Sequence, residues 1–324
     1  MPNAPSSIDL DYVALDLVPK PFITYTLASN HRSASVCTDA LGFRQQYFTG
    51  DQPVDLRELR TRYDRCRVLL GGSAAFGFKA SSDRATMATH LSTDEFPMVN
   101  LALPGAGTQQ ELAALLALLH LLPEIRDVVI FSGLNECVHA VWRPAAVFSQ
   151  FGGTAVGATR QEPPEPAGKQ GRYAEESIDG ATAEDAVLPA EIADERLAMA
   201  LDRVVNNLRI WRLLEDAAGV RVHYVLQPVA GWMAKPLSDQ EQAEFEQNVA
   251  GFPFIRWFTR PVVYQQVRTE VEAGAAAAGI RFHDANEWLA EESRAMFVDV
   301  CHFHDDGQRV MAEHVRRHLD WHDG

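Results

Sequence analysis

The chain has 324 residues, of which 47% are hydrophobic and 23% charged, a composition typical of a globular protein with one large or two modest domains. Its formal net charge is -15 and it has no long cluster of Lys or Arg, which excludes nucleic acid as an expected partner. The longest apolar run, residues 112–122, is interrupted by His120 and is too short to span a bilayer, so no membrane partner is expected.

The four cysteines are scattered and have no paired spacing, which argues against a disulfide framework or a zinc knuckle; they are Cys37, Cys66, Cys137 and Cys301. They favour a reducing compartment. The first 17 residues carry three aspartates and lack a basic region followed by an apolar core, so no secretory signal is predicted. A cytoplasmic location is the expectation.

Residues 1–62 have no clear helical period, and Pro19, Pro21 and Pro53 interrupt them. Their apolar content is low for an independent core. We therefore predict an N-terminal extension packed on a main domain of residues 63–324. Within the extension, residues 38–44 predict a turn that leads into a short extended piece.

The main domain alternates short apolar runs with helical patterns. Strands are predicted at residues 68–70, 98–103, 128–131, 222–226 and 281–284. Helices are predicted at residues 83–91, 109–122, 197–214, 239–249, 262–278 and 306–319. This alternation predicts an α/β fold, a three-layer α/β/α sandwich with a five-stranded parallel sheet of the flavodoxin-like kind. The helix at 109–122 is apolar on nearly every side, which predicts that it is buried.

Residues 151–189 depart from this pattern, because glycine pairs, proline pairs and many acidic residues give them the composition of a flexible insertion. The segment follows the third predicted strand, where a loop could act as a lid over a ligand. A surface loop without a role is the plainer interpretation.

Residues 68–77, Val-Leu-Leu-Gly-Gly-Ser-Ala-Ala-Phe-Gly, predict a buried strand, a glycine turn that carries Ser73, and the start of a helix. Ligands of open α/β sheets bind at the carboxyl ends of such strands. A serine becomes a good nucleophile only when a base takes its proton and a third group orients that base. Asp299 and His302, three residues apart after the fifth strand, are the candidates for these roles.

Acyl transfer also needs hydrogen-bond donors where negative charge develops on the carbonyl oxygen. Gly105 follows the second strand and leaves its backbone N–H accessible, and Asn135 follows the third strand and offers a side-chain amide. Each has a plain alternative interpretation, as a turn residue and as a loop residue. Their common position after predicted strands favours the functional interpretation.

The order serine, glycine, asparagine and histidine, each after a strand, resembles the SGNH (GDSL-type) hydrolase superfamily over residues 66–140 and 280–320. The resemblance implies that Ser73 is the nucleophile, His302 the base and Asp299 its support. It also implies an oxyanion hole formed by the Ser73 N–H, the Gly105 N–H and the Asn135 side chain.

The sequence departs from the superfamily pattern at three positions, where Gly72, Ala102 and Glu136 replace the usual Asp, Gly and Asp. None of these changes removes a catalytic group. Several segments are also similar to a bacterial group named inducer of phenazine A: residues 38–44, 69–73, 131–135 and 226–228. That name describes a phenotype and gives no substrate.

Other chemistries fit less well. His302 and His304 are two residues apart and would point in opposite directions on a strand, so no metal site is expected. Cys301 is more typical of a buried structural thiol than of a nucleophile. Residues 71–73 lack the lysine of a phosphate-binding loop, and no cofactor is implied.

We therefore expect a serine hydrolase that cleaves a small-molecule ester. Two alternatives stay open: an acyltransferase with the same residues, and a non-catalytic binding or regulatory protein on the same fold. The acyl group, the alcohol and the oligomeric state are not predicted.

Overall fold

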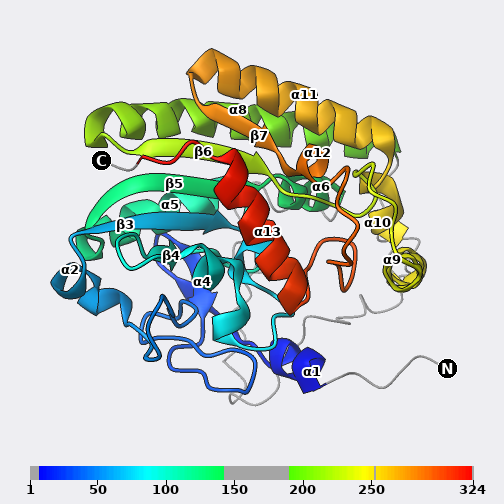
Figure 1. Ribbon diagram of the computed structural model, residues 1–324. Coiled ribbons are helices and arrows are strands. Elements are labelled where there is room, and N and C mark those ends of the chain that lie inside the picture. Colours follow the sequence, from blue (N-terminus) through cyan, green and yellow to red (C-terminus); the bar gives the residue numbers. More distant parts are fainter. Residues whose placement is uncertain (1–6, 142–189, 252, 323–324) are drawn as a thin grey trace, which may run out of the picture.

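The computed structural model describes residues 7–141, 190–251 and 253–322. Its central sheet has five strands in the order β4-β3-β5-β6-β7, and every neighbouring pair is parallel (Figure 1). The strands are β3 (Arg65–Gly71), β4 (Met98–Asn100), β5 (Glu124–Ser132), β6 (Arg221–Leu226) and β7 (Arg281–Asp284). The predicted α/β fold with a five-stranded parallel sheet is confirmed.

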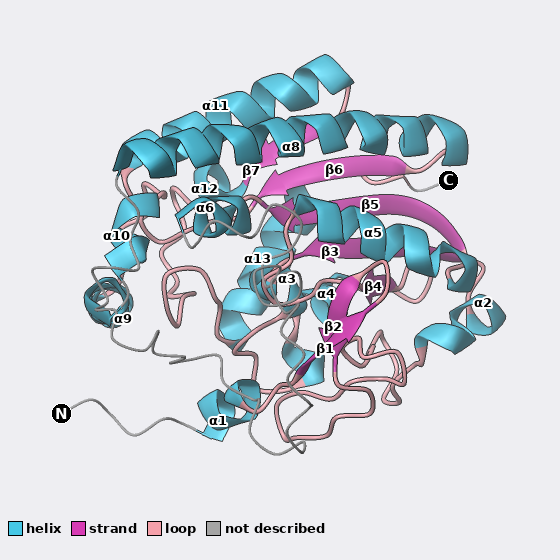
Figure 2. Ribbon diagram, turned by 180° about the vertical axis from the view of Figure 1, so that it is seen from behind, coloured by secondary structure: helices cyan, strands magenta, loops and turns pink. Residues whose placement is uncertain are grey.

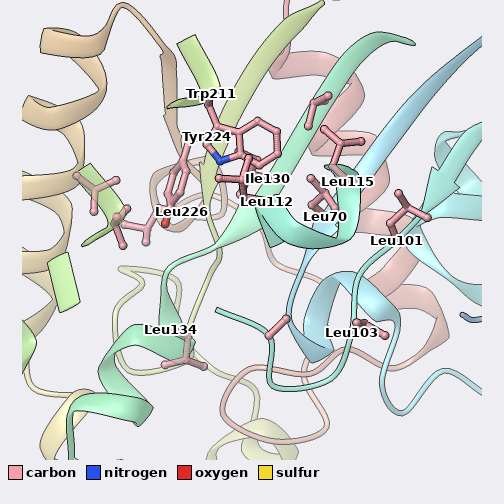
Figure 3. Packing of buried hydrophobic residues seen from close by; sticks show 14 of the residues in the cluster. Leu70, Leu101, Leu103, Leu112, Leu115, Ile130, Leu134, Trp211, Tyr224 and Leu226 are labelled. Atoms are coloured by element: carbon pink, nitrogen blue, oxygen red, sulfur yellow. The ribbon is translucent and has the colours of Figure 1, made fainter. Parts of the chain in front are cut away.

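Alternate side chains of each strand point to opposite faces of the sheet, and each face is covered by helices. On one face, Leu70 and Ile130 pack with residues of α5 (Thr108–Leu118), α8 (Ala190–Ala218) and α11 (Pro261–Ala278), as Figure 3 shows for α5 and α8. On the other face, Leu69 and Phe131 pack with residues of α4 (Met87–Leu91) and α13 (Asp305–His318). In Figure 1, α13 crosses in front of the sheet, and Figure 2 shows α5 and α8 from the opposite side. Two separate cores therefore fix the sheet from both sides.

The structure describes seven further α-helices. They are α1 (Ser7–Val13), α2 (Leu59–Arg62), α3 (Ser73–Phe76), α6 (Leu134–Val141), α9 (Asp239–Gly251), α10 (Pro253–Phe258) and α12 (Ala285–Trp288). No described helix is both long and apolar enough to cross a bilayer.

The helix at residues 109–122 was expected to be buried, and this is confirmed for seven of the eleven residues of α5 but not for its outer side. The helix α5 lies on the outside of the sheet, and Leu116 and Leu119 are 47% and 39% exposed. An outer-layer helix buries one face against the sheet, whatever the polarity of its opposite face.

The N-terminal residues form the antiparallel hairpin of β1 (Leu17–Lys20) and β2 (Thr24–Leu27). Tyr25 at the second strand donates from its hydroxyl to the carbonyl of Pro104, at 2.6 Å. Tyr12 of α1 donates to the carbonyls of Gly77 and Ala80, both at 2.9 Å. The division into an extension and a main domain at residue 62 stays a prediction, and the predicted insertion at 151–189 lies outside the described residues.

Candidate active site

Ser73 is the first residue of α3, directly after β3, an interior strand of the sheet. The turn before it depends on two glycines that allow close backbone approach. A Cβ atom at Gly71, where φ is +145°, would lie 2.2 Å from the carbonyl oxygen of Phe131. A Cβ atom at Gly72 would lie 2.2 Å from the Nδ2 atom of Asn135. Larger residues would separate the Ser73 turn from the ends of the neighbouring elements.

The structure brings His302 and Asp299 to Ser73. The Nε2 atom of His302 is 2.7 Å from the Oγ atom of Ser73, and its Nδ1 atom is 2.6 Å from the Oδ2 atom of Asp299. The backbone N–H groups of Cys301 and His302 donate to the other carboxylate oxygen, at 2.9 and 2.8 Å. Both carboxylate oxygens are thus engaged, and the imidazole is oriented between the acid and the serine.

The two partners shift each other's pKa in opposite directions. Burial opposes ionisation of Asp299, but the His302 ring and two backbone N–H groups outweigh it and hold the pKa of the carboxyl below its ordinary 3.8. Burial likewise opposes protonation of His302, but the Asp299 carboxylate outweighs it and raises the pKa of the imidazole above its ordinary 6.5. A negative charge beside His302 therefore stabilises the imidazolium that would form when Ser73 loses its proton.

Gly105 and Asn135 lie beside this turn. Gly105 follows β4 and has a φ of +77°, and Asn135 lies in the first turn of α6 after β5. The Nδ2 atom of Asn135 donates to the carbonyl of Ala106 at 2.6 Å. A side-chain amide has two N–H donors, so one remains for a ligand at the Ser73 turn.

The loop that carries Asp299 and His302 is fixed at its start by Glu241 of α9, a residue that the sequence analysis missed. The Oε1 atom of Glu241 accepts from the N–H groups of Met296 and Phe297, at 2.7 and 3.2 Å. Its Oε2 atom accepts from Lys235 at 3.1 Å, in an ion pair with both side chains 1% exposed. Although burial opposes ionisation, the N–H donors and Lys235 lower the pKa of Glu241 to about 2.

Arg44 fixes the end of α3, the helix that begins at Ser73, as Glu241 fixes the loop that carries His302. The sequence analysis missed Arg44 too. Its guanidinium is 1% exposed and pairs with Asp83 at 2.8 Å. It also donates to the carbonyls of Phe76 and Gly77, at the end of α3, and to that of Ser35. The sequence analysis placed Arg44 at the end of the predicted turn at residues 38–44, and nothing in the pattern indicated these partners, which lie far along the chain.

Asp299, Cys301 and His302 also place three potential metal ligands within 4.8 Å of one another. The Nδ1–Oδ2 distance of 2.6 Å is that of a hydrogen bond, whereas two ligands of one tetrahedral zinc ion lie about 3.4 Å apart. The Sγ atom is 3.8 Å from both ring nitrogens, so it cannot lie along the lone pair of either. These distances describe a hydrogen-bonded pair beside a thiol and do not fit a metal centre.

No protein-family model matches the sequence, and no curated protein matches it significantly. Among solved structures, the chain is similar to an acetyl xylan esterase, with 10% identity, a TM-score of 0.43, and coverage of 78% of this chain and 99% of that one. It is similar to a member of the lipolytic G-D-S-L family from Veillonella parvula, with 12% identity, a TM-score of 0.41, and coverage of 79% and 98%. An extracellular lipase from Streptomyces rimosus has 14% identity, a TM-score of 0.43, and coverage of 79% and 100%. These neighbours are esterases and lipases, but similarity at this level assigns no activity, so the functional argument rests on the geometry of the site.

Proposed function

We propose that the protein is a serine hydrolase of the SGNH type that cleaves a small-molecule ester. The observation that carries the proposal is the chain of contacts from Asp299 through His302 to Ser73, at 2.6 and 2.7 Å. Serine nucleophiles of acyl-transfer enzymes need this arrangement of base and orienting acid.

In this mechanism the Oγ atom of Ser73 attacks the ester carbonyl carbon while His302 Nε2 takes the hydroxyl proton. The N–H groups of Ser73 and Gly105 and the amide of Asn135 stabilise the oxyanion. His302 then returns the proton to the alcohol oxygen, the C–O bond breaks, and the acyl group stays on Ser73. A water molecule attacks the acyl carbon, its proton passes to His302 and then to Ser73, and the acid leaves.

We also propose that the protein belongs to the inducer of phenazine A group, whose name gives no substrate. A cytoplasmic location is also proposed, supported by four cysteines that are all free thiols.

The proposal is tested with p-nitrophenyl esters of increasing acyl length, measured on wild type, Ser73→Ala and His302→Ala. We expect hydrolysis by wild type, and a loss on the order of 10³-fold or more in each variant. Equal rates in wild type and Ser73→Ala would assign the hydrolysis to another group and overturn the proposal.

A further inference from the structure

The helix α6 contacts the turn of residues 104–108, which carries Gly105, through three side chains. Asn135 donates to the carbonyl of Ala106, and His139 hydrogen-bonds the backbone of Gly105. Between them in sequence, the Oε1 atom of Glu136 accepts from the N–H of Thr108 at 2.8 Å. This turn is therefore attached to α6 at three positions.

The carboxylate of Glu136 also lies against the backbone of the turn at Gly107. A Cβ atom at Gly107 would lie 3.1 Å from both of its carboxylate oxygens. The carboxylate thus lies against the backbone next to Thr108, so close that a Cβ atom at Gly107 would require it to shift by a few tenths of an ångström. Glu136 is 5% exposed, so bulk water does not compete for this contact.

The contact has a physical reason in the position of Thr108, the first residue of α5. The N–H groups in the first turn of a helix have no intrahelical acceptor and carry partial positive charge. A carboxylate there forms a charge-assisted hydrogen bond, which is about twice as strong as a neutral one. The start of α5, and with it the turn before it, is held by the charge of Glu136.

A second buried acid lies close by and offers a control. Glu111 of α5 is 1% exposed and accepts from the hydroxyl of Ser132 at 2.5 Å. Burial raises the pKa of Glu111 to about 8 and that of Glu136 to about 7, the latter opposed by the Thr108 N–H and by Arg203. Among the described residues, the side chain of Glu111 bonds to Ser132 and not to the 104–108 turn, so the two acids share burial but differ in this contact.

We propose that Glu136 is a positioning residue of the oxyanion hole, because its carboxylate fixes the 104–108 turn and with it the direction of the Gly105 N–H. This inference rests on the proposed function. Oxyanion donors act only when they are aimed at the developing charge, so a small displacement of Gly105 reduces kcat and leaves the KM of the ester nearly unchanged.

The test compares Glu136→Gln, Gly107→Ala and the control Glu111→Gln at about pH 9, above the ordinary range of carboxyl groups and above the raised values here. Glu136→Gln keeps the size of the side chain and removes its charge. Gly107→Ala keeps the charge and displaces the carboxylate. The readouts are kcat and KM for p-nitrophenyl acetate, the rate of Ser73 phosphonylation by a fluorophosphonate, and amide hydrogen exchange of residues 104–108.

We expect kcat and the phosphonylation rate to fall ~10- to 100-fold in Glu136→Gln and in Gly107→Ala, with KM within about twofold of wild type. The double variant should be no worse than the more impaired single variant, because both changes break one contact. Exchange at residues 104–108 should accelerate in both variants and stay unchanged in Glu111→Gln.

Phosphonylation of Glu136→Gln at the wild-type rate would overturn the positioning role while leaving the proposed function intact. Unchanged exchange at residues 104–108, or fully additive effects in the double variant, would also overturn it. A wild-type protein that is not phosphonylated would instead overturn the proposed function, and exchange would still report whether Glu136 holds the turn. If Glu136→Gln does not fold, Gly107→Ala answers the same question.

Discussion

Ser73 and His302 meet at one hydrogen bond, but the two sides of the site are built differently. Ser73 begins a helix that continues directly from the interior strand β3, so ladder hydrogen bonds on both sides of β3 fix its position. His302 lies in an irregular loop between α12 and α13, joined to itself by a bridge between Phe297 and Phe303. The carboxylate of Glu241 ties that loop to α9 at Met296 and Phe297.

Because the two sides of the site are held differently, substitutions on the two sides should have different effects on stability and activity. The nucleophile side shares its supports with the fold, since Arg44 joins the N-terminal residues to the end of α3. On the base side, the loop has a backbone bond from Ala230 to Val300, and the carboxylate of Glu241 adds bonds to its N–H groups. Loss of the Arg44 bonds should therefore chiefly reduce stability, whereas loss of the Glu241 bonds should reduce kcat as well as stability.

The largest effect is expected from Asp299→Asn. The amide cannot stabilise the imidazolium and favours the wrong tautomer of His302, so kcat should fall on the order of 10⁴-fold. Steady-state kinetics with p-nitrophenyl acetate measure this. The control is Asp306→Asn, which changes a carboxylate that is 76% exposed near the same loop and should leave kcat unchanged. An Asp299→Asn variant within tenfold of wild type would remove Asp299 from the mechanism.

On the nucleophile side, Arg44→Met should lower the free energy of unfolding by about 3–5 kcal/mol, because it leaves the buried Asp83 without its cation. Urea denaturation followed by circular dichroism measures the loss. The double variant Arg44→Met/Asp83→Leu should recover part of it, because no buried charge is then left alone. A loss under 1 kcal/mol in the single variant would show that the extension does not support α3.

On the base side, Glu241→Gln keeps the shape of the side chain but removes the charge that faces Lys235 and two loop N–H groups. We expect an approximately tenfold lower kcat, and a loss of about 1–3 kcal/mol in the free energy of unfolding. The control Glu241→Gln/Lys235→Met should restore stability more than kcat. Loss of stability with an unchanged kcat would contradict the role given to this loop.

The smallest effect concerns pH. Only neutral His302 can accept the serine proton, so kcat/KM should rise with pH through a midpoint above 6.5, the ordinary pKa that Asp299 raises. In Asp299→Asn the residual activity should have a lower midpoint, because the stabilising negative charge is gone. A pH profile of the phosphonylation rate measures both midpoints. A wild-type midpoint below 6.5 would contradict the arrangement.

The sheet was predictable from the sequence because each strand is a short apolar run bounded by turn residues, and burial on both faces requires such a run. The strand at 68–70 is longer in the structure, Arg65–Gly71, because Arg67 pairs with the buried Asp127 and so fits a buried position. The hairpin β1–β2 was missed because Pro19 suggested a break, although an edge strand tolerates proline.

In the site, the order of Ser73, Gly105, Asn135, Asp299 and His302 was visible because parallel strands bring their carboxyl ends to one edge. Their supports were not, because each contact joins residues far apart in sequence and depends on the folded arrangement. Arg44 reaches an acid 39 positions away, and Glu241 reaches an N–H 55 positions away. The plain alternative for Asn135 was a loop residue, but it lies in the first turn of α6, next to Glu136, and both side chains contact the 104–108 turn.

The most direct test of the central claim is intact-mass analysis after exposure to a fluorophosphonate, on wild type, Ser73→Ala and His302→Ala. The account predicts a single adduct on wild type, located on Ser73 by peptide mapping, with none on Ser73→Ala and little on His302→Ala. A folded wild-type protein that gains no adduct, or an adduct that persists in Ser73→Ala, would contradict it.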